Sequence, residues 1–420
     1  MVKKTRVTLS NGLPLVIVEI PDSKSLVTSF WTKAGSRFDP NGKAGMAHFL
    51  EHLLIKKTKS YPTDIELAQV LENVGAFKNG TTNKDWMNLN ITSSSKDLEL
   101  TMRILSDMVL NPLIDQKGFE TERRVIFQEQ ARQQSRPDDL VWEVWFKTFF
   151  SPSLMINPVL GDERSLQNIK LEESVKFWAE KAKMRSNILL ISGGINANDV
   201  TNLAEKYFAG TKLNEIETPR FSYKAKERII IEKRDLPRTN MLLSFKTPGG
   251  PIYEDFYPLQ VLRGILAAGW SSRIQQRLRV KESLIYGFGA RIIRYFDIGA
   301  FTLIGASDKH NFPKMFQILC EELVKLREKG VSQNELNLAK GFLGGSTLSG
   351  IETSWDYANW YALDELYWPD KVESPEQRIK RINRVKLEEV ESVAKKYLKE
   401  DSWNLAVLGN VQKSEVKVEL

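Results

Sequence analysis

The sequence predicts an α+β fold of two homologous domains, each a mainly antiparallel sheet packed with helices. Its 420 residues exceed what one ordinary core holds. An amphipathic helix followed by a buried strand ending in glycine occurs twice, at residues 170–194 and 386–410. The predicted strands also come in neighbouring pairs with long helical stretches between the groups, which differs from the strict alternation of a parallel sheet.

Strands open both halves of the chain. In the first half, residues 7–20 form two predicted strands around an Asn11–Gly12 turn, and residues 26–35 form another. In the second half the corresponding segments are residues 227–235 and 239–250. Helices and further strands follow in both halves, so the order of elements repeats.

The second copy lies 216 residues after the first. The letters KLEE stand at residues 170–173 and again at 386–389, and at the same offset Gly193 falls on Gly409. Four identical letters could arise by chance, but the matching order and a period near half the chain favour an internal duplication. We therefore expect an N-terminal domain at 1–214, a polar, proline-containing linker at 215–227 and a C-terminal domain at 228–420.

The charge and the cysteine content exclude several classes of protein. The 60 basic and 53 acidic residues are scattered without long runs of one sign, which indicates a mixed solvated surface and no nucleic acid partner. The single cysteine, Cys320, excludes a multi-cysteine zinc site, and its helical surroundings indicate a core thiol. No apolar run is long enough to span a bilayer and the N-terminus lacks a secretory core, so we expect a soluble, cytoplasmic protein without a membrane partner.

Two of the three histidines, His48 and His52, stand four residues apart with Glu51 between them. The segment from Gly45 to Lys56 is a predicted helix, and these three side chains share one stripe among apolar neighbours. A buried stripe of this kind is costly unless something satisfies it, as a divalent metal would. The His-x-x-Glu-His order is the reversed zinc-peptidase motif. The alternative is a hydrogen-bonded pair of core histidines.

Zinc in a hydrolytic site takes a third protein ligand and keeps an open position for water. The remaining histidine, His310, lies in a predicted loop of the other half, so a carboxylate is the expected ligand. Glu122 and Glu129 are seven residues apart on a predicted helix at 119–134 and share a face. Their spacing alone leaves the choice between them open.

Four segments around these residues follow a common pattern: LSNGLPLVIVE at 9–19, GSRFDPNGKAGMAHFLEHLLIKKTKSYP at 35–62, GAFKNGTTNKDWMNL at 75–89 and ERRVIFQEQ at 122–130. They resemble the pitrilysin and insulinase (M16) family of zinc metallopeptidases, in its mitochondrial-processing-peptidase-like subfamily. The resemblance returns in the second half, so it covers essentially the whole chain. It implies one Zn²⁺ per chain, with His48, His52 and Glu129 as ligands, Glu51 as general base and Glu122 supporting the ligands from behind.

The resemblance also implies how a substrate is held. Asn79 matches an asparagine beside an edge strand that binds substrate backbone, and Arg279 and Tyr286, in SSRIQQRLRVKESLIYGFGA, match a pair that binds the substrate near the metal. Two residues depart from the family pattern, because Val280 replaces an acidic residue and Ser283 a glycine. The alternative is that Arg279 and Tyr286 have no role in substrate binding and simply lie on a helix and on the strand after it.

The implied function is that of a zinc-dependent metalloendopeptidase that hydrolyses peptides or unfolded segments inside a dimer chamber. A homodimer is expected because one chain carries both the metal motif and the Arg279/Tyr286 pair, although a heterodimer is possible. One alternative is a catalytically silent subunit that binds zinc and peptides during assembly; the presence of Glu51 argues against it. The other is an interaction scaffold without metal.

Overall fold

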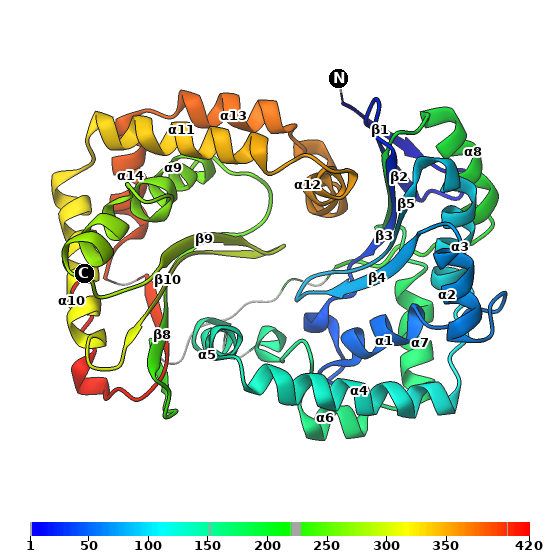
Figure 1. The fold of residues 1–420 in the computed structure, drawn as a ribbon, viewed down its shortest axis with the longest axis horizontal. Helices are drawn as coiled ribbons and strands as arrows, with labels where there is room; N and C mark the ends of the chain where they lie inside the picture. Colours follow the sequence, from blue (N-terminus) through cyan, green and yellow to red (C-terminus); the bar gives the residue numbers. More distant parts are fainter. Residues whose placement is uncertain (1, 151–152, 219, 221–227, 401) are drawn as a thin grey trace. The chain divides into compact units, whose positions relative to one another are not determined.

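The computed structural model describes residues 2–150, 153–218, 220, 228–400 and 402–420. The chain forms two compact units, each with its own sheet and helices (Figure 1), which confirms the predicted α+β class. Unit 1 comprises residues 1–132, 157–219 and 351–372, and unit 2 comprises residues 133–156, 220–350 and 373–420. The predicted linker at 215–227 lies mostly outside the described residues.

The sheet of unit 1 has the strand order β1-β2-β6-β3-β5-β4. Neighbouring strands are antiparallel, except that β2 and β6 are parallel. The strands are β1 (Lys3–Thr8), β2 (Pro14–Glu19), β3 (Ser25–Thr32), β4 (Phe77–Thr82), β5 (Met87–Ser94) and β6 (Ile188–Gly193). Because β4 ends the order, it is an edge strand, and this position bears on the site below.

The sheet of unit 2 has the order β7-β11-β8-β10-β9. Its strands are β7 (Ile229–Glu232), β8 (Arg238–Pro248), β9 (Phe288–Arg294), β10 (Ile298–Asp308) and β11 (Trp403–Leu408). The pair β7 and β11 is parallel and all other pairs are antiparallel. With β1 set aside, the two orders correspond strand by strand, so the predicted duplication is confirmed at the level of the fold.

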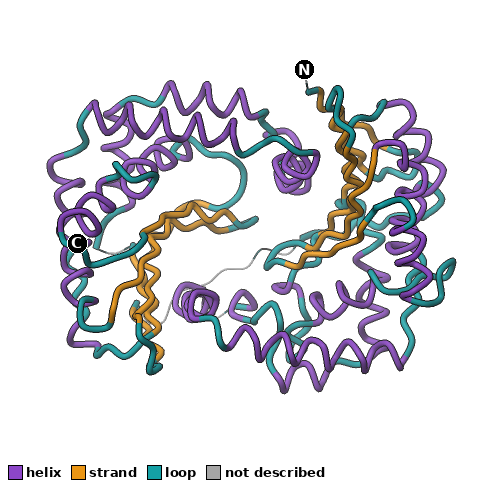
Figure 2. Tube along the Cα trace, viewed as in Figure 1, coloured by secondary structure: helices purple, strands orange, loops and turns teal. Residues whose placement is uncertain are grey.

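Most helices of each unit lie on one face of its sheet (Figure 2). In unit 1 they are α1 (Met46–Leu54), α2 (Asp64–Glu72), α3 (Leu98–Leu110), α4 (Gln116–Gln134), α6 (Glu163–Asn168), α7 (Leu171–Lys181) and α8 (Ala197–Phe208). In unit 2 they are α9 (Phe256–Ala267), α10 (Phe312–Lys329), α11 (Gln333–Ser349), α13 (Pro375–Arg384) and α14 (Leu387–Tyr397).

Cys320 is buried in α10, as expected. No helix of the described residues is long and apolar enough to cross a membrane.

The repeated KLEE letters begin equivalent helices. In α7 the Glu173 carboxylate accepts a hydrogen bond from the backbone N–H of Lys170, and in α14 Glu389 accepts the same bond from Lys386. Each glutamate thereby satisfies a backbone donor at the start of its helix. The local sequence therefore explains why both helices begin where they do.

The repeated glycines lie at the ends of equivalent strands, because Gly193 is the last residue of β6 and Gly409 directly follows β11. Gly193 has φ 155° and Gly409 has φ 154°. A Cβ atom at Gly193 would lie 2.4 Å from the carbonyl oxygen of Ser25, and one at Gly409 would lie 2.6 Å from Oγ1 of Thr239. The chain passes too close to the neighbouring strand at both places for any other residue.

The two halves exchange one helix each. Helix α5 (Pro137–Phe150), from the first half, packs on β8 and β11 of unit 2, where Trp145 is fully buried. Helix α12 (Ser354–Tyr367), from the second half, packs on β3 and β6 of unit 1, where Glu365 is bound by Lys4 and Arg6. The predicted domains, 1–214 and 228–420, are each continuous in sequence. In the structure, each half of the chain also contributes one helix to the other unit.

Candidate metal centre

The N-terminus of α1 is fixed by a carboxylate from the preceding loop. The side chain of Asp39 accepts hydrogen bonds from the backbone N–H groups of Gly45, at 2.8 Å, and Ala47, at 2.9 Å. Gly45 has φ 92°, and a Cβ atom there would lie 2.9 Å from Gly161, so only glycine fits. Burial raises the pKa of Asp39 to about 7, although these backbone hydrogen bonds oppose the shift. The helix that carries the histidines is thus anchored at its first turn.

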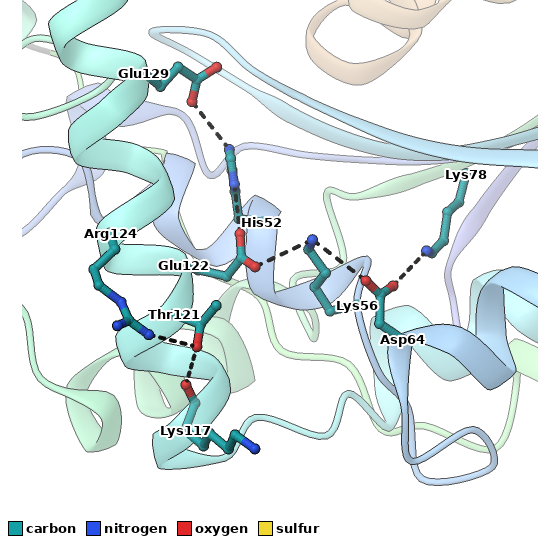
Figure 3. A network of polar contacts seen from close by, with 9 residues as sticks. All are labelled: His52, Lys56, Asp64, Lys78, Lys117, Thr121, Glu122, Arg124 and Glu129. Atoms are coloured by element: carbon teal, nitrogen blue, oxygen red, sulfur yellow. Dashed lines mark hydrogen bonds and ion pairs between the residues drawn. The ribbon is translucent and has the colours of Figure 1, made fainter.

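The structure brings His48, His52 and Glu129 together. The two imidazole centroids are 4.6 Å apart on one side of α1, and Glu129 reaches them from α4. Its Oε2 atom lies 3.7 Å from Nε2 of His48. The same oxygen lies 3.5 Å from Nε2 of His52, a contact that Figure 3 shows. Among the described residues this is the one group of three His, Cys, Asp or Glu side chains that could hold a metal ion. His310 belongs to unit 2, where it is exposed in the turn after β10.

These distances suit a zinc ion. Ligand atoms about 2.0–2.1 Å from a tetrahedral zinc are about 3.3–3.4 Å apart. The observed 3.5 and 3.7 Å are close to that spacing and too long for good hydrogen bonds. Within the described part of the chain, Oε2 of Glu129 is buried without a hydrogen bond. A bound metal would satisfy this buried oxygen, which is otherwise costly.

Glu122 holds His52 from behind. Its Oε2 atom lies 3.1 Å from Nδ1 of His52, which leaves Nε2 of the ring facing Glu129. Its other oxygen is 3.3 Å from Nζ of Lys56, and Lys56 in turn contacts Asp64 (Figure 3). A carboxylate in this place fixes the ring orientation and makes the imidazole a better ligand. The two glutamates that share a face of α4 thus occupy different places, one in the cluster and one beside it.

The two histidines differ in their affinity for protons. Burial, followed by the neighbouring His52, lowers the pKa of His48 to about 4, so this ring is neutral at pH 7. Burial also lowers the pKa of His52, but its contacts with Glu122 and Glu129 outweigh burial and raise that pKa to about 9. A metal ion binds neutral imidazole, so binding here would displace a proton from His52.

Glu51 lies on the same helix, against the edge strand β4. Its Oε2 atom accepts a hydrogen bond of 2.7 Å from Oγ1 of Thr82. A Cβ atom at Gly80 would lie 2.4 Å from Cγ of Glu51, so the glutamate occupies the space that a side chain would take. The side chain is only 8% exposed, and burial raises its pKa. Neither Thr82 nor Gly80 was identified from the sequence, because the pairing register of β4 cannot be deduced from its letters.

Asn79 lies on the same strand with an exposed side chain. In the register of the sheet it is paired with Asn90 of β5. The other side of β4 has no partner strand within the described sheet, so its backbone groups there are open to an added strand.

In unit 2, the structure places Arg279 and Tyr286 in contact. Arg279 lies in the π-helical segment Gln275–Lys281, and its guanidinium donates a hydrogen bond to the carbonyl oxygen of Tyr286. The guanidinium also lies 4.0 Å from the ring centroid of Trp270. The Tyr286 side chain is 68% exposed and precedes β9. Ser283, where the family pattern has glycine, has φ 54°, a left-handed conformation that glycine adopts more readily.

Two family models match the chain. The model described as "Insulinase (Peptidase family M16)" matches residues 15–163, and the model described as "Peptidase M16 inactive domain" matches residues 172–343. Together they span most of the sequence. The description "inactive domain" agrees with the sequence of the second half, which has one histidine, His310, and therefore lacks the paired histidines of the first half.

Curated relatives match along nearly their whole length. A protein of Mycobacterium leprae, titled an uncharacterized zinc protease, is 28% identical over 410 residues, which is 96% of this chain and 91% of that protein. YmxG of Bacillus subtilis, with the same description, is 25% identical over 400 residues, which is 94% of this chain and 96% of that protein.

Solved structures match the fold. A protease from Helicobacter pylori has a TM-score of 0.87 at 23% identity, over 97% of this chain and all of that chain. A Pseudomonas fluorescens protein titled as a peptidase M16 inactive domain has a TM-score of 0.88 at 17% identity, over 98% of both chains. At these sequence identities, the similarity shows a shared fold and nothing about activity.

Proposed function

The chain belongs to the M16 peptidase family, and on this basis we propose that it is a zinc-dependent metalloendopeptidase that hydrolyses peptides or unfolded segments. The observation that carries the proposal is the cluster of His48, His52 and Glu129 on two helices, with Glu51 one residue from a ligand. Relatives titled as zinc proteases support the choice of metal and reaction.

The proposed chemistry divides between the metal and the chain. A zinc ion held by His48, His52 and Glu129 would supply Lewis acidity, which polarises the scissile carbonyl and lowers the pKa of bound water. Glu51 would accept a proton from the attacking water as the water oxygen bonds to the carbonyl carbon, and it would pass that proton to the amine nitrogen as the peptide C–N bond breaks. Burial raises the pKa of Glu51, which makes its carboxylate a stronger base than an exposed glutamate. Glu122 keeps the His52 ring oriented throughout.

The edge of β4 supports an extended substrate. A peptide could pair with this open edge through main-chain hydrogen bonds, which give affinity with little sequence preference. The exposed Asn79 is the proposed side chain that binds the substrate backbone beside this edge.

We also propose a homodimer of the mitochondrial-processing-peptidase-like kind, in which Arg279 and Tyr286 of one chain serve the metal site of the other. The hydrogen bond from the Arg279 guanidinium to the backbone carbonyl oxygen of Tyr286 holds the two residues together, and the Tyr286 side chain is exposed. Both observations support a role in binding. Mixing a Glu51→Gln chain with an Arg279→Ala/Tyr286→Phe chain should restore activity through one intact composite site. No recovery after demonstrated subunit exchange would contradict this part of the proposal.

Hydrolysis of an unstructured fluorogenic peptide tests the proposed function. Protein purified without chelator should turn the peptide over, lose activity with a strong zinc chelator and regain it when zinc is restored. Turnover that chelation leaves unchanged would contradict a metal-dependent reaction. Bound zinc without turnover would instead support a silent zinc-binding subunit.

A further inference from the structure

We propose that Thr82 is a positioning residue for Glu51, an inference that rests on the proposed function. Its hydroxyl holds one oxygen of the glutamate, so that the other oxygen, Oε1, is left to receive the proton of the water. Nothing in the sequence motif assigns a role to this threonine, since it lies 31 residues after Glu51 on a different element.

The first support is the contact itself. Oγ1 of Thr82 donates a hydrogen bond of 2.7 Å to Oε2 of Glu51. A glutamate has several rotatable side-chain bonds and would otherwise sample several rotamers. Because a hydroxyl bonded to a charged oxygen makes a strong hydrogen bond, this contact selects one rotamer of Glu51.

The second support is the shape of the strand. Residues 80 and 82 of β4 point to the same face, because side chains alternate along a strand. At Gly80 the missing side chain makes room for Cγ of Glu51, and two residues later Thr82 reaches the carboxylate. One face of the strand therefore supplies both the space for the glutamate and the donor that fixes it.

The third support is the position of β4 in the sheet. It is the edge strand to which an extended peptide is proposed to pair. Through Thr82, Glu51 is tied to that strand as well as to α1. The separation between the base and the scissile bond is then set by a single strand, and small misplacements of a catalytic group cost much activity.

Two substitutions separate the hydroxyl from the shape of the side chain. Thr82→Val keeps the branched shape and removes the donor, whereas Thr82→Ser keeps the donor. Thr8→Val is the matched control, because Thr8 is an exposed threonine that also ends an edge strand of this sheet. For each protein, kcat, KM, zinc content and melting temperature are measured with the same unstructured peptide.

We expect Thr82→Val to lower kcat by about 10- to 100-fold while KM changes less than about twofold. Zinc content and melting temperature should match the wild type, and Thr82→Ser and Thr8→Val should keep near-normal kcat. An unchanged kcat in Thr82→Val, or a loss accompanied by loss of zinc or of folding, would overturn the positioning role. If the wild type itself shows no zinc-dependent turnover, the proposed function fails first, and this inference fails with it.

Discussion

Nδ1 of His52 lies 3.1 Å from Oε2 of Glu122, and this contact leaves the opposite nitrogen of the ring facing His48 and Glu129. The geometry of the candidate metal centre therefore depends on a residue that is not itself in the cluster. Glu122 is nearly buried, at 5% exposure, so its effect is little screened by solvent.

Removing the Glu122 carboxylate should weaken zinc binding. We expect Glu122→Ala to lower zinc affinity by about 10- to 100-fold, because the His52 ring loses its orienting partner. Competition with a chromogenic chelator measures the affinity. Glu72→Ala, at an exposed position of α2, is the control and should bind zinc normally. Equal affinity in both variants would contradict the role of Glu122.

Zinc should stabilise the fold through His48. At a free zinc concentration about 100 times Kd, binding adds about 2.7 kcal/mol to the free energy of unfolding. Chelation should therefore lower the melting temperature of the wild type, and His48→Ala should not respond to zinc. His310→Ala, which changes an exposed histidine of unit 2, should respond as the wild type does. A zinc response that survives in His48→Ala would place the metal elsewhere.

Asp39 should make stability depend on pH. Its pKa is about 7 in the folded chain and about 3.9 in an unfolded one, so the folded state binds more protons between these values. The free energy of unfolding should fall as pH rises from about 4 to about 7, by up to about 4 kcal/mol from this group, and then level off.

Urea unfolding of metal-free wild type and Asp39→Asn at pH 4.5 and 7.5 measures this contribution. The metal-free state is used because zinc binding itself depends on pH. The wild type should lose more stability than the variant between the two pH values, since asparagine does not titrate. Parallel losses would show that Asp39 is not a buried acid of raised pKa.

The exchanged helices should hold the two halves together after the chain is divided. Residues 1–214 carry α5, which belongs to unit 2, and residues 228–420 carry α12, which belongs to unit 1. Co-expressed as separate chains with a tag on one, the two pieces should purify as a complex. Trp145→Asp, which places a charge in the buried face of α5, should weaken that complex. Two pieces that purify separately from the start would contradict this prediction.

The sequence was most informative where the relevant signal is local. Three features depend on residues close together in sequence: helix α1, the N-termini of the two repeated helices, and the glycines at the ends of the two repeated strands. The structure contains all three. The choice between Glu122 and Glu129 was different. Spacing placed both on one face of α4, and the distances to the histidine rings distinguish them.

Other features could not be predicted because they depend on long-range packing. The apolar face of α5 indicates that the helix is buried, but it does not tell which sheet covers it. The bond from Thr82 to Glu51 requires the register of β4 against β5 and the position of α1 beside them. Neither is encoded in a short pattern of letters.

The most direct test of the central claim is the turnover of an unstructured peptide by Glu51→Gln, with zinc measured in the same sample. Glutamine keeps the shape of the side chain and an oxygen for Thr82 but cannot act as a base. We expect wild-type zinc content and melting temperature, with turnover reduced by about 10²- to 10⁴-fold. Undiminished turnover in a zinc-loaded Glu51→Gln protein would contradict the proposed mechanism.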